Sequence, residues 1–297
     1  MVTRNTILLI LSVVCFCEIT IAQKCPDFVE STTCGGNIIG DSGIIRYNHS
    51  GYGENSGCVW LIRSNISSTV QVRLLADTFS TNQFIEINHV FLDGEIGGNS
   101  GSYIRHGDFS PREFNGPVIL VRFASLKIYN ATINATVPSF TLFYRGCGTN
   151  IVNPPTFTHY LRERSPGERE VVTYPKDGGL YQPNQLVTYL GLRKDRAILN
   201  NSEGEWKVKV LYQDMQTSSY CLFGDSLKFF SGGFNMLTAL DEKNEFIWRF
   251  CQRNSNQTHV LPKVSPKYGN VYPDNVGILA IFASNGYQEG KGFVFEW

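Results

Sequence analysis

The chain carries a spacing pattern that occurs twice, and this limits its fold more than any single residue does. In the first half, Tyr52 is followed six residues later by Cys58 and two residues after that by Trp60. The second half repeats both spacings with Tyr181, Val187 and Tyr189. A diverged internal repeat predicts two copies of one fold in tandem.

Two further pairs of segments follow in the same order in both halves. The apolar run Ile119–Ser125 matches Ile278–Ser284. Each run is followed by an aromatic segment, and these are Ser139–Tyr144 and Gly292–Trp297. The alignment makes Trp60 and Tyr189 equivalent, and we expect both to be buried.

The pattern of apolar residues predicts strands rather than helices. Val70–Leu74 and Trp206–Val210 alternate apolar and polar residues, as expected for a sheet with one buried and one wet face. Clusters of Gly, Asn, Ser and Pro separate such segments, for example at 94–102 and 262–275. We therefore expect an all-β chain of two tandem antiparallel β-sandwich domains.

The N-terminus has the features of a secretory signal peptide. Arg4 precedes the apolar run Ile7–Cys17, and small residues lead to an expected cut after Ala22. The alternative is a buried first strand or helix. No other segment approaches the about 20 apolar residues that a membrane span needs. We expect residues 1–22 to be removed, no transmembrane segment, and a secreted, extracellular protein.

Charge and glycosylation signals restrict the classes of partner. The chain has 26 basic and 26 acidic residues and no basic stripe, which argues against nucleic acid. The signal Asn-X-Ser/Thr predicts a glycoprotein with six acceptors: Asn48, Asn65, Asn130, Asn134, Asn200 and Asn256.

The sequence places the boundary between the copies near residues 146–148. Two prolines follow at 154–155, and then a charged run at 162–170. This run is either a linker or an edge covering the second sheet.

The first half resembles the CUB domain family over about 34–144. The matching stretches are Cys34–Gly36, Gly43–Ile45, Tyr52, Cys58–Ile62, Phe123–Ser125 and Phe140–Tyr144. The second half resembles a diverged CUB domain over 147–297, in which Val187 and Tyr189 replace the family's cysteine and tryptophan. The resemblance implies a jelly-roll β-sandwich in each half.

The resemblance also implies two disulfides. Cys34 and Cys58 correspond to the family's first pair, and Cys221 and Cys251 resemble its second pair. Cys25 and Cys147 bracket the first domain, and we expect them to bond as well. In the alternative, Cys147 belongs to the second domain and bonds another chain.

Some CUB domains bind calcium through three carboxylates, and neither half keeps them. The matching positions are Ser80, Gln83 and Leu126 in the first half, and Ser218, Asp225 and Asn285 in the second. Calcium takes six to eight oxygen ligands. We therefore expect no metal or cofactor, with Asp225 and Asn285 as the remaining candidates. The alternative is that Asp225 accepts hydrogen bonds from loop amides.

Two serine motifs look catalytic, yet neither has the partners that the chemistry needs. Gly40–Gly43 resembles the serine motif of trypsin-like proteases, but too little chain precedes Ser42 for the histidine and aspartate. Gly224–Leu227 resembles another hydrolase motif, but no histidine lies three residues after an aspartate. We expect no enzymatic activity.

The resemblance implies non-catalytic recognition of an extracellular protein or glycan. Candidate binding segments are residues 94–106, 192–204 and 232–244. One alternative is a structural matrix or secretion component assembled by self-association, and another is a secreted hydrolase acting through Ser226. The oligomeric state does not follow from the sequence.

Overall fold

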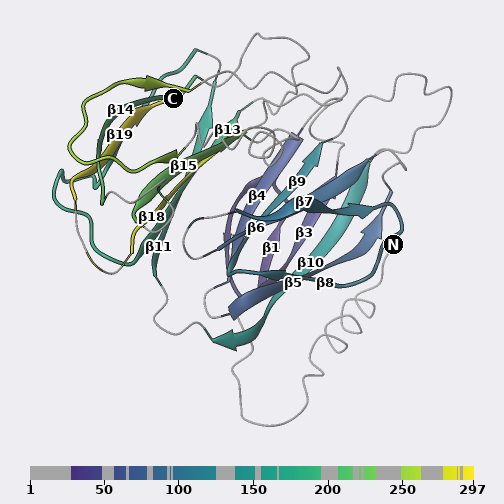
Figure 1. The fold of residues 1–297 in the computed structure, drawn as a ribbon. Coiled ribbons are helices and arrows are strands. Elements are labelled where there is room, and N and C mark those ends of the chain that lie inside the picture. Colours follow the sequence, from purple (N-terminus) through teal and green to yellow (C-terminus); the bar gives the residue numbers. More distant parts are fainter. Residues whose placement is uncertain are drawn as a thin grey trace.

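The computed structural model describes residues 28–48, 57–64, 67–78, 83–91, 94, 96–124, 138–150, 155–165, 167–194, 207–216, 221, 224–231, 249–261, 277–285, 287 and 290–297. The named elements in these ranges are all β-strands, so this part of the chain is all-β. The expected signal peptide lies outside these ranges. Figure 1 shows the strands in two groups, one from each half of the sequence.

The first half forms two five-stranded sheets around one core. Its strands are β1 (Phe28–Ser31), β2 (Gly36–Ile39), β3 (Ser42–Asn48), β4 (Gly57–Arg63), β5 (Ser67–Asp77), β6 (Phe84–Val90), β7 (Ile96–Arg105), β8 (Arg112–Asn115), β9 (Val118–Ala124) and β10 (Ser139–Asn150). The sheet orders are β1-β3-β10-β5-β8 and β2-β4-β9-β6-β7. Trp60, Phe123 and Leu142 are buried between them, which is the arrangement of a β-sandwich.

The second half forms a five-stranded and a four-stranded sheet. Its strands are β11 (Thr156–Arg164), β12 (Val171–Tyr174), β13 (Gln185–Arg193), β14 (Lys209–Asp214), β15 (Ser226–Ser231), β16 (Arg249–Phe250), β17 (His259–Val260), β18 (Gly277–Ala283) and β19 (Gly292–Glu296). The sheet orders are β11-β13-β18-β15-β16 and β12-β19-β14-β17. Tyr189, Phe282 and Phe295 lie in the core that these sheets share.

The two halves share one strand topology. The order β3-β10-β5-β8 in the first half corresponds to β12-β19-β14-β17 in the second, and β2-β4-β9-β6-β7 corresponds to β11-β13-β18-β15-β16. Each strand number in the second half is nine higher than that of its counterpart. The parallel pair β2–β4 returns as the parallel pair β11–β13. In the described part of the chain, only β1 has no counterpart. The sequence repeat is therefore a repeat of topology.

The register of the strands confirms the predicted alignment. Trp60 lies opposite Val121, and Tyr189 lies opposite Ala280, the residues that the alignment matches. Trp60 is 0% exposed and Tyr189 is 3% exposed, as expected.

A β-bulge also recurs at matching positions. The pairing of β5 with β10 skips Leu75, and the pairing of β14 with β19 skips Leu211. Because a bulge bends a strand and increases its twist, the two copies share local shape as well as strand order.

One aromatic cluster in each core was not predicted. Tyr47 on β3 stacks on Phe140 with ring centroids 5.3 Å apart. Tyr174 on β12 stacks in the same way on Phe293, at 5.5 Å. This match aligns β12 with the C-terminal part of β3.

Three of the four sheets are mixed, whereas the sequence predicted antiparallel sandwiches; the sheet β12-β19-β14-β17 is antiparallel throughout. The pairs β1–β3, β2–β4 and β11–β13 are parallel. The cause is the path of the chain: β1, β2, β3 and β4 alternate between the two sheets, so a strand returns to its own sheet in its original direction.

In two segments the structure differs from the sequence interpretation, and in a third it decides between the two alternatives that the sequence left open. The expected boundary at 146–148 lies inside β10, because backbone pairing with β5 continues through Gly146 and Cys147. The candidate loop 94–106 is mostly the edge strand β7, which pairs with β6 on one side only. The charged run begins in β11, so this part covers an edge of the second sheet and is not a linker.

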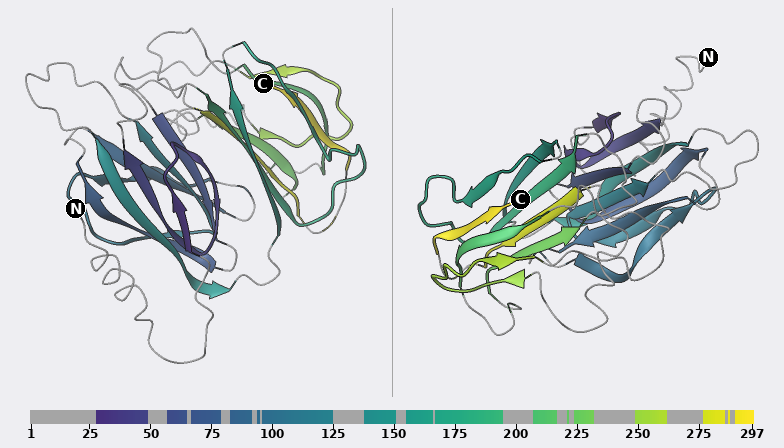
Figure 2. Two further views of the ribbon diagram at one scale, coloured as in Figure 1. Left: turned by 180° about the vertical axis from the view of Figure 1, so that it is seen from behind. Right: turned by 90° about the horizontal axis from the view of Figure 1, so that it is seen from above.

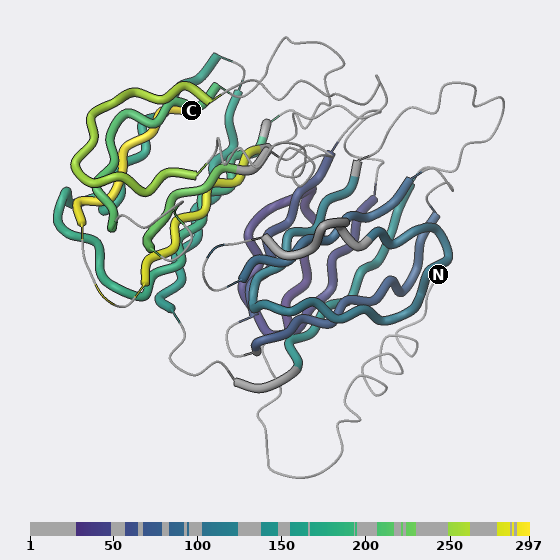
Figure 3. The backbone as a smooth tube through the Cα atoms, in the orientation of Figure 1, coloured from purple at the N-terminus to yellow at the C-terminus, as the bar shows by residue number. Residues whose placement is uncertain are grey.

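The two halves meet through the outward faces of two sheets. The contact is one buried apolar cluster with Val59, Leu61, Val90, Val118 and Leu120 from the first half and Leu186, Leu190, Leu192, Leu279, Ile281 and Ala283 from the second. Figure 2 shows the two groups of strands side by side in two further views, and Figure 3 follows the chain from one to the other.

Charged side chains at this contact include an ion pair and a guanidinium stacked on a ring. Glu86 and Arg122 lie opposite each other on β6 and β9 and form a buried ion pair. The Arg63 guanidinium lies 4.0 Å from the centroid of the Phe157 ring of the second half. Pairing of this kind lowers the cost of burying charge between the two sheets.

Candidate functional site

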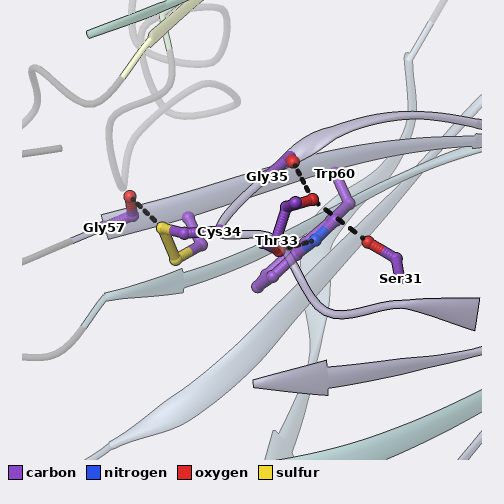
Figure 4. The surroundings of a disulfide bond; sticks show 7 residues. Ser31, Thr33, Cys34, Gly35, Gly57 and Trp60 are labelled. Carbon is purple, nitrogen blue, oxygen red and sulfur yellow. Dashed lines mark hydrogen bonds between the residues drawn. A yellow bond between two sulfur atoms is a disulfide. The ribbon is translucent and has the colours of Figure 1, made fainter. Parts of the chain in front are cut away.

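Both cysteine pairs implied by the resemblance are bonded. The Cys34–Cys58 disulfide joins the start of β2 to β4. Beside it, Trp60 Nε1 donates a hydrogen bond to the Thr33 carbonyl at 3.0 Å (Figure 4). The Cys221–Cys251 disulfide joins the approach to β15 to the end of β16. Each disulfide therefore links two segments of the same half, the first in the N-terminal half and the second in the C-terminal half.

The third expected disulfide remains a prediction, because Cys25 lies outside the described residues. Cys147 is half-buried on β10 and is not bonded to any cysteine in the described ranges. Burial raises the pKa of the Cys147 thiol, which reduces its reactivity as a thiolate.

Asp225 and Asn285, the two metal candidates, lie together at one end of the second half. Asp225 is fully buried just before β15, and its carboxylate accepts hydrogen bonds from the Tyr181 hydroxyl and from the Asn285 amide, the latter at 2.7 Å. Burial raises the pKa of Asp225, and these two hydrogen bonds act in the opposite direction. The Asn285 side chain in turn donates to Gln216 Oε1 at 2.7 Å.

A second buried carboxylate holds the same loop from its other side. Asp214, at the end of β14, accepts the amides of Asn254 at 3.1 Å and of Lys291 at 3.0 Å. Gly290 passes so close that a Cβ there would lie 2.2 Å from the Asp214 carbonyl oxygen. Backbone hydrogen bonds and a close approach that only glycine permits therefore position Asn285, Gly290 and Lys291, which lie on either side of Tyr287 in the sequence.

This loop end presents two large apolar side chains to solvent. Tyr287 is 88% exposed, and its amide donates to Asn285 Oδ1 at 3.0 Å. Leu180 is 53% exposed and precedes Tyr181, whose amide donates to the Gly290 carbonyl at 2.9 Å. We define the exposed side chains of Leu180 and Tyr287 as the loop-end surface. An exposed aromatic side chain suits contact with another macromolecule.

The arrangement around Asp225 does not suit a cation. Both carboxylate oxygens receive hydrogen-bond donors, whereas a metal would need those lone pairs. Ser218 lies outside the described residues, and in the described ranges no three His, Cys, Asp or Glu side chains gather as metal ligands would. The carboxylate clamps a loop, which is the alternative that the sequence left open.

The two serine motifs lie inside strands rather than at an accessible site. Ser42 begins β3 and Ser226 begins β15, and both are buried. Within the described ranges, neither hydroxyl bonds a histidine. Nucleophilic catalysis needs a serine that reaches both a base and a substrate, and neither position offers this.

The remaining predicted sites are only partly described. Asn48 at the end of β3 and Asn256 after β16 are exposed, as acceptors of glycans must be, and their glycosylation stays a prediction. Outside the described residues lie Asn65, Asn130, Asn134 and Asn200. Of the candidate segment 192–204, Leu192 is buried between the halves, and 232–244 lies outside the described ranges.

The loop-end surface was not predicted from the sequence. Tyr287 is one of 14 tyrosines, and only the short polar stretch Asn285–Gly286 before it indicates a turn. Its exposure depends on Asp214 and Asp225, which lie far away in sequence.

In the described residues, no helix has the length and apolar character needed to cross a bilayer. No protein-family model matches the chain, and no curated protein matches it.

Three solved structures resemble the chain weakly. The CUB1-EGF-CUB2 domains of rat MASP-1 match at 12% identity and a TM-score of 0.30, over 88% of this chain and 99% of that one. The same domains of human MASP-1/3 match at 12% identity and a TM-score of 0.27, over 86% of this chain and 98% of that one. The full extracellular region of zebrafish Gpr126/Adgrg6 matches at 11% identity and a TM-score of 0.29, over 90% of this chain and 37% of that one. TM-scores of this size do not assign a shared fold.

Proposed function

We propose that the chain is a secreted, non-catalytic recognition protein that binds a protein partner through the loop-end surface. The observation that carries the proposal is Tyr287, which is 88% exposed on a segment held by two buried carboxylates. Residues whose backbone amides are already held, such as Asn285 and Lys291, lose little conformational entropy on binding.

The proposed architecture is two CUB-like jelly-roll domains. The repeated topology and the landmark residues of the first half support it. The strand pairing supports domain bounds of 28–150 and 155–297, because β1 begins at Phe28 and β10 ends at Asn150. The first domain is therefore wider than the 34–144 expected from the sequence. The second begins later than the expected 147–297.

Secretion is part of the proposal and rests on two features. Residues 1–22 have the pattern of a signal peptide, and two disulfides are formed. Disulfides persist mainly in oxidising compartments such as the extracellular space.

The proposal is tested with the fluorescently labelled, secreted protein on intact cells. We expect saturable binding that protease treatment of the cells removes, and a loss of at least about tenfold in affinity for Tyr287→Ala. Val260→Ser, which changes another exposed apolar residue on β17, is the matched control and should bind as the parent does.

Three results would contradict the proposal. Unchanged binding by Tyr287→Ala would show that the loop-end surface is not the binding site. Binding that survives protease but not glycosidase would replace the protein partner with a glycan. Absence of binding together with large assemblies in sedimentation would favour the structural, self-associating alternative.

A further inference from the structure

Within the ranges that the structure describes, the first half contains one strand without a counterpart in the second half. β1 lies parallel to β3, with Phe28 opposite Ser42 and Glu30 opposite Ile44. With β1 in place, Ile44 is 7% exposed. Glu30 also reaches diagonally to Arg46, with Arg46 Nε 2.5 Å from Glu30 Oε1.

Among the described residues, no strand lies beside the equivalent edge in the second half. Matching Tyr174 to Tyr47 places Val171 at the position of Ile44 and Arg169 at that of Ser42. Val171 is 56% exposed, in contrast to 7% for Ile44. In the described part of the chain, β12 pairs with β19 alone.

The backbone of this edge is oriented for pairing. Glu170 and Trp297 exchange both of their backbone hydrogen bonds, at 3.1 Å each. In an antiparallel pair the hydrogen-bonded residues alternate, so Val171 and Thr173 direct their N–H and C=O groups away from β19. Two donors and two acceptors therefore line the open edge, which is the template for an added strand.

The charges beside the edge favour an acidic strand. Arg169 has 78% of its side chain exposed, and its Nη1 lies 4.0 Å from Glu296 Oε1, a carboxylate that Lys209 Nζ also approaches at 3.5 Å. The Glu170 carboxylate is engaged by Arg162 Nε at 3.1 Å, Arg164 at 2.7 Å and Trp297 Nε1 at 3.1 Å, so its charge is compensated. An acidic residue at the position that Glu30 takes beside β3 would lie next to Val171 and diagonal to Arg169.

We propose that the open edge of β12 binds an extended segment of a partner protein as an added parallel strand, in the position that β1 takes beside β3. The segment carries an apolar residue facing the core, as Val29 does, and an acidic residue beside Val171. Main-chain hydrogen bonds supply the affinity, and the alternating side chains supply the specificity. This edge does not depend on the loop-end surface.

The probe is a fluorescein-labelled, end-capped peptide with the sequence of residues 27–33 of this chain, titrated into the secreted protein and followed by anisotropy. Val171→Pro removes an outward N–H without touching the β12–β19 hydrogen bonds, and we expect it to weaken binding at least tenfold. Val171→Thr keeps that N–H and should bind within about twofold of the parent. Arg169→Glu should weaken binding of this peptide and favour one in which lysine replaces Glu30.

Hydrogen exchange of the unaltered protein gives a second readout that does not depend on a variant folding. The peptide should protect the amides of Val171 and Thr173. No binding of the peptide, or equal binding by Val171→Pro with no protection at these amides, would overturn the proposal. If the protein instead self-associates and Val171→Pro abolishes this, the occupant of the edge is a second copy of the chain. That result would overturn the proposal of a different partner protein.

Discussion

At the scale of single residues, equivalent positions in the two copies have different polar surroundings. Trp60 Nε1 donates to the Thr33 carbonyl, whereas the Tyr189 hydroxyl is buried with no hydrogen-bond partner in the described part of the chain. Thr33 lies between β1 and β2, a connection that the second half does not repeat. There, Tyr160 stacks on Tyr189 with centroids 4.7 Å apart.

The Tyr189 hydroxyl is predicted to contribute nothing to stability. Tyr189→Phe removes a buried group that has no partner, so the free energy of unfolding should stay the same or rise by up to about 1 kcal/mol. Tyr181→Phe is the matched variant: it removes one of the hydrogen bonds to the buried Asp225 carboxylate and should cost about 1–3 kcal/mol. Urea unfolding measures both, and equal losses would show that Tyr189 has a partner.

The site was also only partly predictable at this scale. The family resemblance gave Asp225 and Asn285 as the two remaining metal candidates, and in the structure the Asn285 amide donates to the Asp225 carboxylate. Their role as a loop clamp depends on Tyr181, which the sequence marked only as a repeat landmark.

At the scale of elements, short connections depend on glycine where strands meet closely. Gly292 begins β19 with φ +78°, and a Cβ there would lie 1.9 Å from the Tyr174 carbonyl oxygen. The residue therefore has to be glycine for two reasons, a left-handed backbone and a close approach.

Gly292→Ala is predicted to destabilise the second half. The clash and the positive φ together should cost well over about 1 kcal/mol, because neighbouring backbone must move. Gly167→Ala is the control, since Gly167 has φ +84° but nothing within 4 Å of a Cβ. Thermal unfolding compares the two, and an equal effect would mean that the contact with Tyr174 contributes nothing.

Edge strands were the elements that the sequence described least well. β7 contains Gly97, Gly98 and Gly101, which indicated a loop, yet the segment pairs with β6. An edge strand has one neighbour and needs few packed side chains, so its sequence carries a weak signal.

At the scale of the whole molecule, the contact between the halves contains a titratable group. His159 on β11 bonds the Thr188 hydroxyl through Nδ1, and its Nε2 atom is buried without a partner in the described residues. Burial, and then the nearby Arg63 charge, lower the pKa of His159 to about 4.

The stability of the joined halves is predicted to fall in acid. Because the folded pKa of about 4 lies below the ordinary 6.5, this group's contribution is complete above pH 6.5 and is lost as pH falls toward 4. The loss should reach on the order of 3 kcal/mol. Unfolding free energies at several pH values measure it, and the difference between the parent and His159→Gln isolates it.

That difference is needed because Glu86 acts in the opposite direction. Burial raises the pKa of the Glu86 carboxyl, so its protonation in acid favours the folded state. If His159→Gln follows the same pH profile as the parent, protonation of His159 does not weaken the contact.

The sequence alone determined the strand-rich class, the tandem repeat, the core positions of Trp60 and Tyr189, and two cysteine pairs. Each of these follows from spacing within one copy or from a family resemblance, because alternation along a strand fixes which side chains face the core. The tertiary structure alone decided the parallel pairs, the contact between outward sheet faces, the clamped loop and the open edge of β12. These depend on which strands become neighbours, and the runs Ile119–Ser125 and Ile278–Ser284 illustrate why. They are apolar on both faces because a second sheet covers each of them, and a pattern along one strand does not identify the sheet that covers it.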